Sequence, residues 1–164
     1  MTKRNDIVRK YAVAGSRMPG RAMVRIAAFA GLTVGMAVSA HAAGVTIQKP
    51  WMRFIIKERP AGGYFTLHND SAKPIKLVGA SSTACGSMML HQTKDIKGVE
   101  HMLPVKSITV PVRGTLKFQP GSYHIMCMKP QAAMVIGHKV PVTLKFADGK
   151  TITAQFAVTG PGGP

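Results

Sequence analysis

The sequence predicts an all-β fold, an antiparallel β-sandwich or barrel. From residue 45 onward, short runs of alternating apolar residues, rich in β-branched and aromatic types, follow one another, and Gly, Pro, Asn or Asp separates them. A sustained apolar stripe at the helical period of 3.6 residues is absent from the sequence. Many short strands joined by regular turns are typical of sandwiches and barrels.

The expected strands cover residues 45–48, 51–57, 63–69, 75–81, 87–93, 99–103, 107–110, 115–119, 122–128, 139–147 and 150–158. The pair Asp148-Gly149 lies between the last two of them and predicts a tight hairpin, because both residue types tolerate the positive φ of such turns. Residues 131–137 have room for a single turn of helix.

Residues 1–42 have the features of a secretory signal peptide. Basic residues precede an apolar stretch, Ile26 to Ala40, and Ala40-His41-Ala42 is a small-x-small cleavage pattern. The apolar stretch is shorter than the roughly 20 residues of a membrane-spanning helix, so an uncleaved anchor is the weaker alternative. We therefore expect export to the periplasm and no stable membrane insertion after cleavage. The true start codon is open among Met1, Met18 and Met23.

The rest of the chain is predicted to be one domain, residues 43–159, followed by a flexible Gly/Pro tail, residues 160–164. The net charge of +16 falls to +10 beyond residue 42, because residues 1–42 hold seven of the 22 basic and one of the six acidic residues. The remaining basic residues are scattered and little interleaved with aromatic ones, so we expect no nucleic-acid binding. Six acidic residues leave little for carboxylate-pair hydrolysis or a calcium or magnesium site.

Four residues have the chemistry of a metal site: His91, Met102, His124 and Met126. His124 and Met126 are two positions apart on one expected strand, so their side chains share a face. Thioether and imidazole without carboxylate form a soft ligand set that suits Cu(I) and discriminates against magnesium, calcium and manganese. Outside the cytoplasm, methionine also avoids the oxidation that threatens a thiolate ligand. If the strands meet at one end of the sandwich, these side chains converge on one Cu(I) ion.

The spacing of the four residues, H-x10-M-x21-H-x-M, resembles the signature of the periplasmic copper chaperone family PCu(A)C. Residues 51–53, 61–69, 77–81 and 120–126 are also similar to that family, and the resemblance covers about residues 45–158. It implies a cupredoxin-like (immunoglobulin-like) β-sandwich with a Cu(I) site near solvent. The ligands that it implies are His91, Met102, His124 and Met126.

The resemblance implies a monomeric copper carrier and not an enzyme. Such a carrier would pass Cu(I) by ligand exchange to the CuA centre of cytochrome c oxidase subunit II or to a Sco-type thiol protein. The sequence departs from the family pattern at Gln92, Ser122 and Cys127, where Met, Gly and Leu are common, and none of these changes removes a ligand. The C-terminal tail contains neither His nor Met, so we predict no second copper site there.

Two other functions compete with a copper carrier. A blue-copper electron-transfer protein needs a Cys thiolate, two His and a weak Met ligand, and the residues around Cys127 do not have the usual order or spacing. An exported structural sandwich would use its methionines as core residues. A hydrolase is least supported, because the sequence has no Gly-x-Ser-x-Gly elbow.

The roles of several neighbouring residues follow from strand alternation. Met89 and Met128 share faces with the proposed ligands, and we expect them to pack at the rim. His101 lies beside Met102 in sequence and should point away from it. Cys85 and Cys127 are compatible with a disulfide, with two separate thiols or with an auxiliary copper site, and only their distance can decide.

Overall fold

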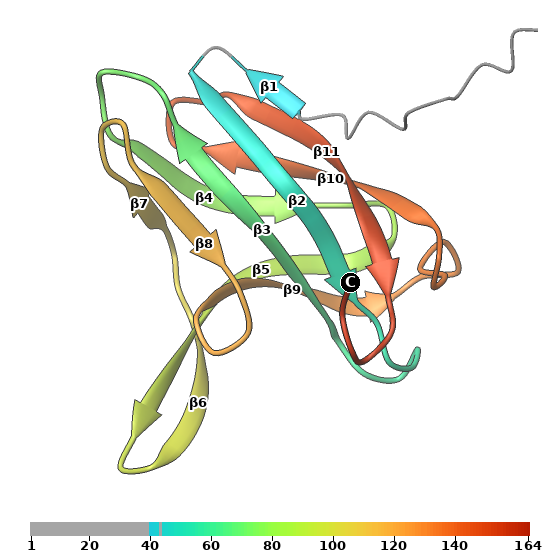
Figure 1. Cartoon of the computed structure of the whole chain (residues 1–164). Helices are drawn as coiled ribbons and strands as arrows, with labels where there is room; N and C mark the ends of the chain where they lie inside the picture. Colours follow the sequence, from blue (N-terminus) through green and yellow to red (C-terminus); the bar gives the residue numbers. More distant parts are fainter. Residues whose placement is uncertain (1–39, 43) are drawn as a thin grey trace, which may run out of the picture. The chain divides into compact units, whose positions relative to one another are not determined.

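Figure 1 shows the computed structural model, which describes residues 40–42 and 44–164. Its strands are β1 (Ala40–Ala42), β2 (Val45–Arg53), β3 (Ala61–Asn69), β4 (Ile75–Ser81), β5 (Cys85–Ile96), β6 (Val99–Pro104), β7 (Ile108–Val110), β8 (Thr115–Phe118), β9 (Tyr123–Pro130), β10 (Lys139–Phe146) and β11 (Thr151–Thr159). This part of the chain contains no helix, and the predicted all-β sandwich is confirmed.

The strands form one continuous hydrogen-bonded sheet that folds over on itself around a core (Figure 1). Their order is β6-β5-β9-β8-β3-β2-β11-β10-β4-β7, with β1 paired to β2 and an additional pairing of β9 with β3. Most pairs are antiparallel, as predicted, but β2 pairs with β11 and β8 with β9 in parallel. The β9–β3 pairing joins two halves of the proposed site.

Two local expectations differ from the structure. The expected strands 45–48 and 51–57 are one strand, β2, whose register shifts between Gln48 and Trp51, and this strand ends at Arg53. The possible helical turn in residues 131–137 is a pair of hydrogen-bonded turns. The predicted hairpin at Asp148-Gly149 is present, with Gly149 at φ 82°.

The core consists of inward-facing apolar side chains from both parts of the folded sheet. Phe65 stacks on Phe118 with ring centroids 4.2 Å apart and meets Phe156 edge to face. Met52 is fully buried among them, so this methionine is a packing residue. Burial of aromatic side chains of this size contributes much of the stability of a small β domain.

Gly62 and Gly63 allow β3 to approach β9 closely. A Cβ on Gly63 would lie 2.5 Å from Cγ1 of Ile125 and 2.7 Å from Sδ of Met52, inside the core. A Cβ on Gly62 would lie 2.7 Å from the phenol oxygen of Tyr64, on the opposite face. Both contacts are shorter than van der Waals distance, so only glycine fits at either position without a shift of its neighbours.

A disulfide between Cys85 and Cys127 connects β5 to β9. The two Cα atoms are 5.3 Å apart, and Cys127 is fully buried in the core. This decides the question that the sequence left open: neither cysteine is a free thiol. Cys127 belongs to the core cluster, on the opposite face of β9 from His124.

The chain ends lie partly outside the described residues. The basic segment of the predicted signal peptide, its apolar stretch up to residue 39 and all three candidate start codons are among residues 1–39, of whose structure nothing is described. In the described part, no helix is long and apolar enough to cross a membrane. In the C-terminal tail the amide of Gly163 donates to the carbonyl of Gly160, and Gly163 lies beside the indole of Trp51. The domain bounds and the flexibility of residues 160–164 stay predictions.

We expect removal of the disulfide to destabilise the domain by about 4 kcal/mol, because the bond closes a loop of roughly 43 residues in the unfolded chain. The measurement is urea unfolding of the oxidised protein against the double variant Cys85→Ala/Cys127→Ala. Equal unfolding free energies, or two free thiols in the denatured unreduced protein, would contradict the assignment.

Candidate metal centre

One outer face of the sheet carries all four proposed ligands. Paired residues on adjacent strands point their side chains to the same side. The register pairs His91 with His124, Met89 with Met126 and Thr93 with Met102. It also pairs Gly62 with Met126, and Arg53 with Gly62, so that the same face continues across β9, β3 and β2.

The turn between β5 and β6 sets the position of Met102. Lys97 and Gly98 have φ values of 55° and 80°, and Ile96 pairs with Val99 across them. Two successive residues with positive φ make the tight turn that joins antiparallel strands most directly. A slip of one residue in this hairpin would move Met102 to the opposite face, because side chains alternate along a strand.

The two imidazoles are in contact, with centroids 5.7 Å apart and planes at 85°. His124 is 3% exposed, and its Nδ1–H donates to the carbonyl of Ser122 at 3.1 Å. This bond leaves Nε2 of His124 as the unprotonated nitrogen. Among the described residues, neither Nε2 of His124 nor the buried Nδ1 of His91 has a hydrogen-bond partner. Both atoms are therefore free to coordinate a metal ion.

Burial keeps both imidazoles neutral. It lowers the pKa of His91, and the neighbouring His124 lowers it further. Burial also lowers the pKa of His124; the bond to Ser122 raises it, and the charge of Arg53 lowers it. A metal ion at neutral pH therefore meets two neutral nitrogen donors and displaces no proton from them.

A cavity of about 300 Å³ opens beside His124. Met102, Thr93 and Met126 line it from β6, β5 and β9. Met102 is 57% exposed, whereas Met126 is half-buried. The site thus combines enclosed imidazoles with a thioether at its mouth. In the part of the chain that is described, no group of three His, Cys, Asp or Glu side chains converges on one point, so a hard-ligand centre is not formed.

Three residues around the cavity were not part of the predicted site. Tyr64 packs between Trp51 and His124, with ring centroids 4.6 Å and 6.2 Å away. Arg53 donates from Nη2 to the phenol oxygen of Tyr64 at 2.9 Å and lines the cavity with Glu100. Arg53 was indicated only by the similarity of residues 51–53 to the family. Its closeness to His124 depends on the pairing of β2, β3 and β9.

The residues assigned to the rim lie as alternation predicts. Met89 pairs with Met126 and is 41% exposed, and Met128 is half-buried on the same face. His101 pairs with Lys94 on the other face of the hairpin. Elsewhere, Nε2 of His68 on β3 lies 2.9 Å from Oδ1 of Asp70, and its Nδ1 forms a hydrogen bond with Thr115.

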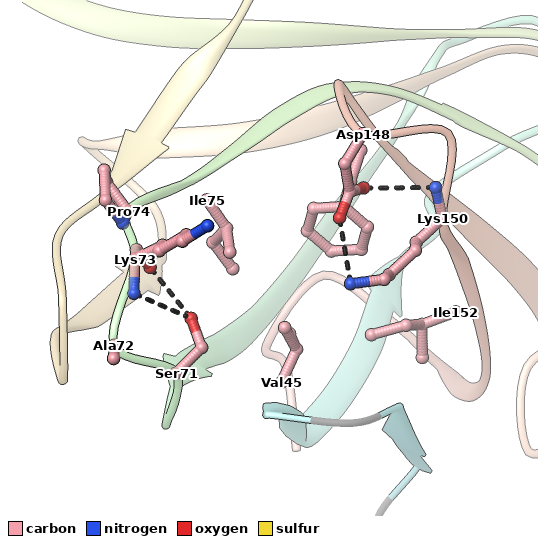
Figure 2. A pocket seen from close by; sticks show the side chains of 10 residues that line it. Val45, Ser71, Ala72, Lys73, Pro74, Ile75, Asp148, Lys150 and Ile152 are labelled. Carbon is pink, nitrogen blue, oxygen red and sulfur yellow. Dashed lines mark hydrogen bonds and ion pairs between the residues drawn. The ribbon is translucent and has the colours of Figure 1, made fainter.

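A second cavity, of about 410 Å³, lies at the other end of β2 and β3 (Figure 2). Figure 2 shows Val45 and Ile152 on its wall, beside the ion pair of Lys150 with Asp148. None of the four proposed ligands lines it. Its apolar walls and a lysine–aspartate pair that satisfies itself give no metal-binding chemistry.

The family model described as "Putative lipoprotein LpqE-like" matches residues 45–158. The chain belongs to the LpqE-like family. This confirms the resemblance to the PCu(A)C proteins. "Putative lipoprotein Lxx21020" of Leifsonia xyli is 36% identical over 112 residues, which cover 68% of this chain and 67% of that protein.

Solved structures of the same kind agree with the fold. The Cu(I) form of DR1885 from Deinococcus radiodurans is 35% identical, with a TM-score of 0.54 over 71% of this chain and 75% of that one. The copper-bound PCuAC domain from PmoF2 is 22% identical, with a TM-score of 0.62 over 74% of this chain and 98% of that domain, and it supports the fold alone. Both of those structures are copper-bound forms.

We expect His124 to be the Nδ1–H tautomer at neutral pH, because Nδ1 donates to Ser122. Its apparent pKa should lie below the value of about 6.5 for a free imidazole, since burial lowers it. Long-range ¹H–¹⁵N NMR correlation of the apo protein measures both. A predominant Nε2–H tautomer, or a pKa above that value, would contradict the geometry.

Proposed function

We propose that this chain is an exported copper-binding carrier whose cargo is a single Cu(I) ion held by His91, Met102, His124 and Met126. The observation that carries the proposal is the pair of buried imidazole nitrogens without hydrogen-bond partners, beside a cavity lined by two thioethers. The Cu(I) form of DR1885, which is 35% identical to this chain, supports the same cargo.

The ligand chemistry favours Cu(I) over other ions. Thioethers bind soft Cu(I) well and bind hard cations poorly, and neutral imidazole is acceptable to Cu(I). The nearest carboxylate in the cavity, on Glu100, is one hard group and not a cluster. Calcium or magnesium would find too few oxygen ligands here, because calcium takes six to eight or so of them.

The uneven exposure of the ligands supports transfer by ligand exchange. His124 is 3% exposed and His91 is half-buried, but Met102 is on a strand, β6, whose residues are all exposed. An incoming ligand of an acceptor can replace Met102 first while both His residues still hold the ion. The exchange replaces one coordination bond by another. It changes neither the oxidation state of the copper nor any covalent bond, so the protein acts as a carrier and not as an enzyme.

Apolar side chains around the mouth suit the docking of an acceptor protein. Ile55 lines the cavity and is 48% exposed, and Met102 at its mouth is 57% exposed. Exposed apolar side chains that gather at one place are typical of interaction sites. The acceptor that we propose is the CuA domain of cytochrome c oxidase subunit II or a Sco-type thiol protein.

The periplasm is the proposed location. The signal-peptide pattern of residues 1–42 and the lipoprotein names of the relatives both support export. The disulfide suits an oxidising compartment. It also weakens the blue-copper alternative, because both cysteines of the chain are in the bond and neither supplies a thiolate.

Replacing His124 or Met102 by Ala should lower the Cu(I) affinity by about tenfold to a hundredfold or more. Loss of a group that only orients a metal ligand already lowers metal affinity by about tenfold to a hundredfold. The measurement is anaerobic competition with a colorimetric Cu(I) chelator. X-ray absorption of the loaded protein should show both sulfur and nitrogen neighbours, with fewer sulfur neighbours in Met102→Ala.

Matched control variants lie beside the proposed ligands. His101→Ala removes an imidazole next to Met102 but on the other face, and Met128→Ala removes a thioether two residues from Met126. Both should keep the wild-type affinity. Unchanged affinity in the His124 and Met102 variants, or equal losses in the controls, would refute the ligand set.

We also expect Cu(I) to pass from the loaded protein to an apo CuA domain or to a reduced Sco-type protein. Transfer is followed by separating the two proteins and measuring copper in each. Copper that stays bound to this chain in the presence of excess acceptor would refute the proposed delivery, without affecting the assignment of the ligands.

A further inference from the structure

Arg53 brings a positive charge to the copper cavity, and in the part of the chain that is described this charge has no ion-pair partner. Its side chain lines the cavity together with Met102, His124 and Met126. Its Nη2 donates to the phenol oxygen of Tyr64 at 2.9 Å, and its Cζ atom lies 5.4 Å from the centroid of the Tyr64 ring. One polar bond and one ring contact therefore fix the guanidinium in place.

Arg53 has no ion-pair partner among the described residues, although Glu100 lines the same cavity. In residues 44–164 the ion pairs join His68 to Asp70 and Lys150 to Asp148, and no carboxylate lies within 4.0 Å of Arg53. Its partner Tyr64 is a neutral phenol, and burial raises the pKa of that group further.

A cation without an ion-pair partner is unexpected at the edge of a cation site. The positive charge of Arg53 does not favour copper binding, and a neutral hydrogen-bond donor could hold Tyr64 equally well. A fixed charge in a half-buried place acts on every ion that enters, and its effect grows with the charge of that ion.

We infer that Arg53 is a specificity-determining residue that selects the oxidation state of the cargo: its fixed charge disfavours Cu(II) relative to Cu(I). The inference rests on the proposed function. Cu(II) carries one more unit of positive charge than Cu(I) at the same ligands, so the guanidinium repels it more strongly. At a separation of about 10 Å and an effective dielectric constant of about 20, one unit of charge changes the ratio of the two affinities roughly tenfold.

Glu100 provides an internal test of the same idea. It lines the cavity from β6, and its Oε1 lies 3.9 Å from the position that a Cβ on Gly121 would have. Its negative charge acts on the copper in the opposite direction to Arg53. Neutralising each residue should therefore shift the ratio of affinities in opposite directions.

The experiment compares the wild-type protein with Arg53→Met, Arg53→Lys and Glu100→Gln. Cu(I) dissociation constants are measured anaerobically, and Cu(II) dissociation constants in air, each by competition with a chelator of known affinity. Arg53→Met should strengthen Cu(II) binding relative to Cu(I) binding about tenfold, by the Coulomb argument. Arg53→Lys keeps the charge and should stay near the wild-type ratio, and Glu100→Gln should weaken Cu(II) binding relative to Cu(I).

Arg113→Met is the matched control, since it removes the same charge from the turn after β7. That turn contacts Asn69 at the far end of β3 from Tyr64. The control should leave the ratio unchanged. If Arg53→Met fails to fold, as judged by circular dichroism, Arg53→Gln replaces it, and Glu100→Gln tests the charge effect independently.

Three results would overturn the inference: an unchanged ratio in Arg53→Met, an equal shift in Arg53→Lys, or an equal shift in Arg113→Met. The second would mean that the shape of the side chain matters and not its charge. The wild-type Cu(I) affinity separates a test of the proposed function from a test of the role of Arg53. Absence of Cu(I) binding to the wild-type protein refutes the proposed function itself, whereas tight Cu(I) binding with an unchanged ratio refutes only the role of Arg53.

Discussion

The register of β5 is the constraint on which the rest of the site depends. On one side β5 pairs with β9, which sets His91 opposite His124, and on the other side it pairs with β6, which sets Thr93 opposite Met102. The disulfide joins β5 to β9 on the core side, and the tight turn at Lys97-Gly98 fixes β6. Because the side-chain period of a strand is two, any slip would disrupt the core and the outer face together.

The two unpartnered imidazole nitrogens lower the stability of the metal-free protein. Each buried imidazole nitrogen without a hydrogen-bond partner costs about 1–3 kcal/mol relative to a satisfied group. In the proposed copper complex the ion accepts a lone pair from each of these nitrogens and so removes that cost. The core stability of the sandwich and the Cys85–Cys127 bond thus maintain two unsatisfied donors in a fixed geometry, and the affinity for a soft cation benefits from this preorganisation.

The strands were largely predictable from the sequence, because turn residues and alternation are local signals. The end of β2 at Arg53 was not, since residues 54–57 continue the apolar pattern but lack a partner strand. The disulfide depends on a distance between two strands, which no local pattern contains. The grouping of His91, Met102, His124 and Met126 on one face follows from the register, and spacing alone could not establish it. Arg53 was missed because two strand pairings, β2 with β3 and β3 with β9, bring it to His124.

A carrier with this charge must hold its cargo without help from long-range attraction. Beyond residue 42 the chain has a net charge of +10, so its overall field repels cations. Hard cations depend on carboxylates for binding, and here they meet one acidic side chain and a fixed guanidinium. Coordination by thioether sulfur and neutral imidazole acts only at bonding distance and does not require opposite charge. The proposed soft, neutral ligand set therefore favours Cu(I) through coordination, and the charge of Arg53, by our inference, adds to that preference.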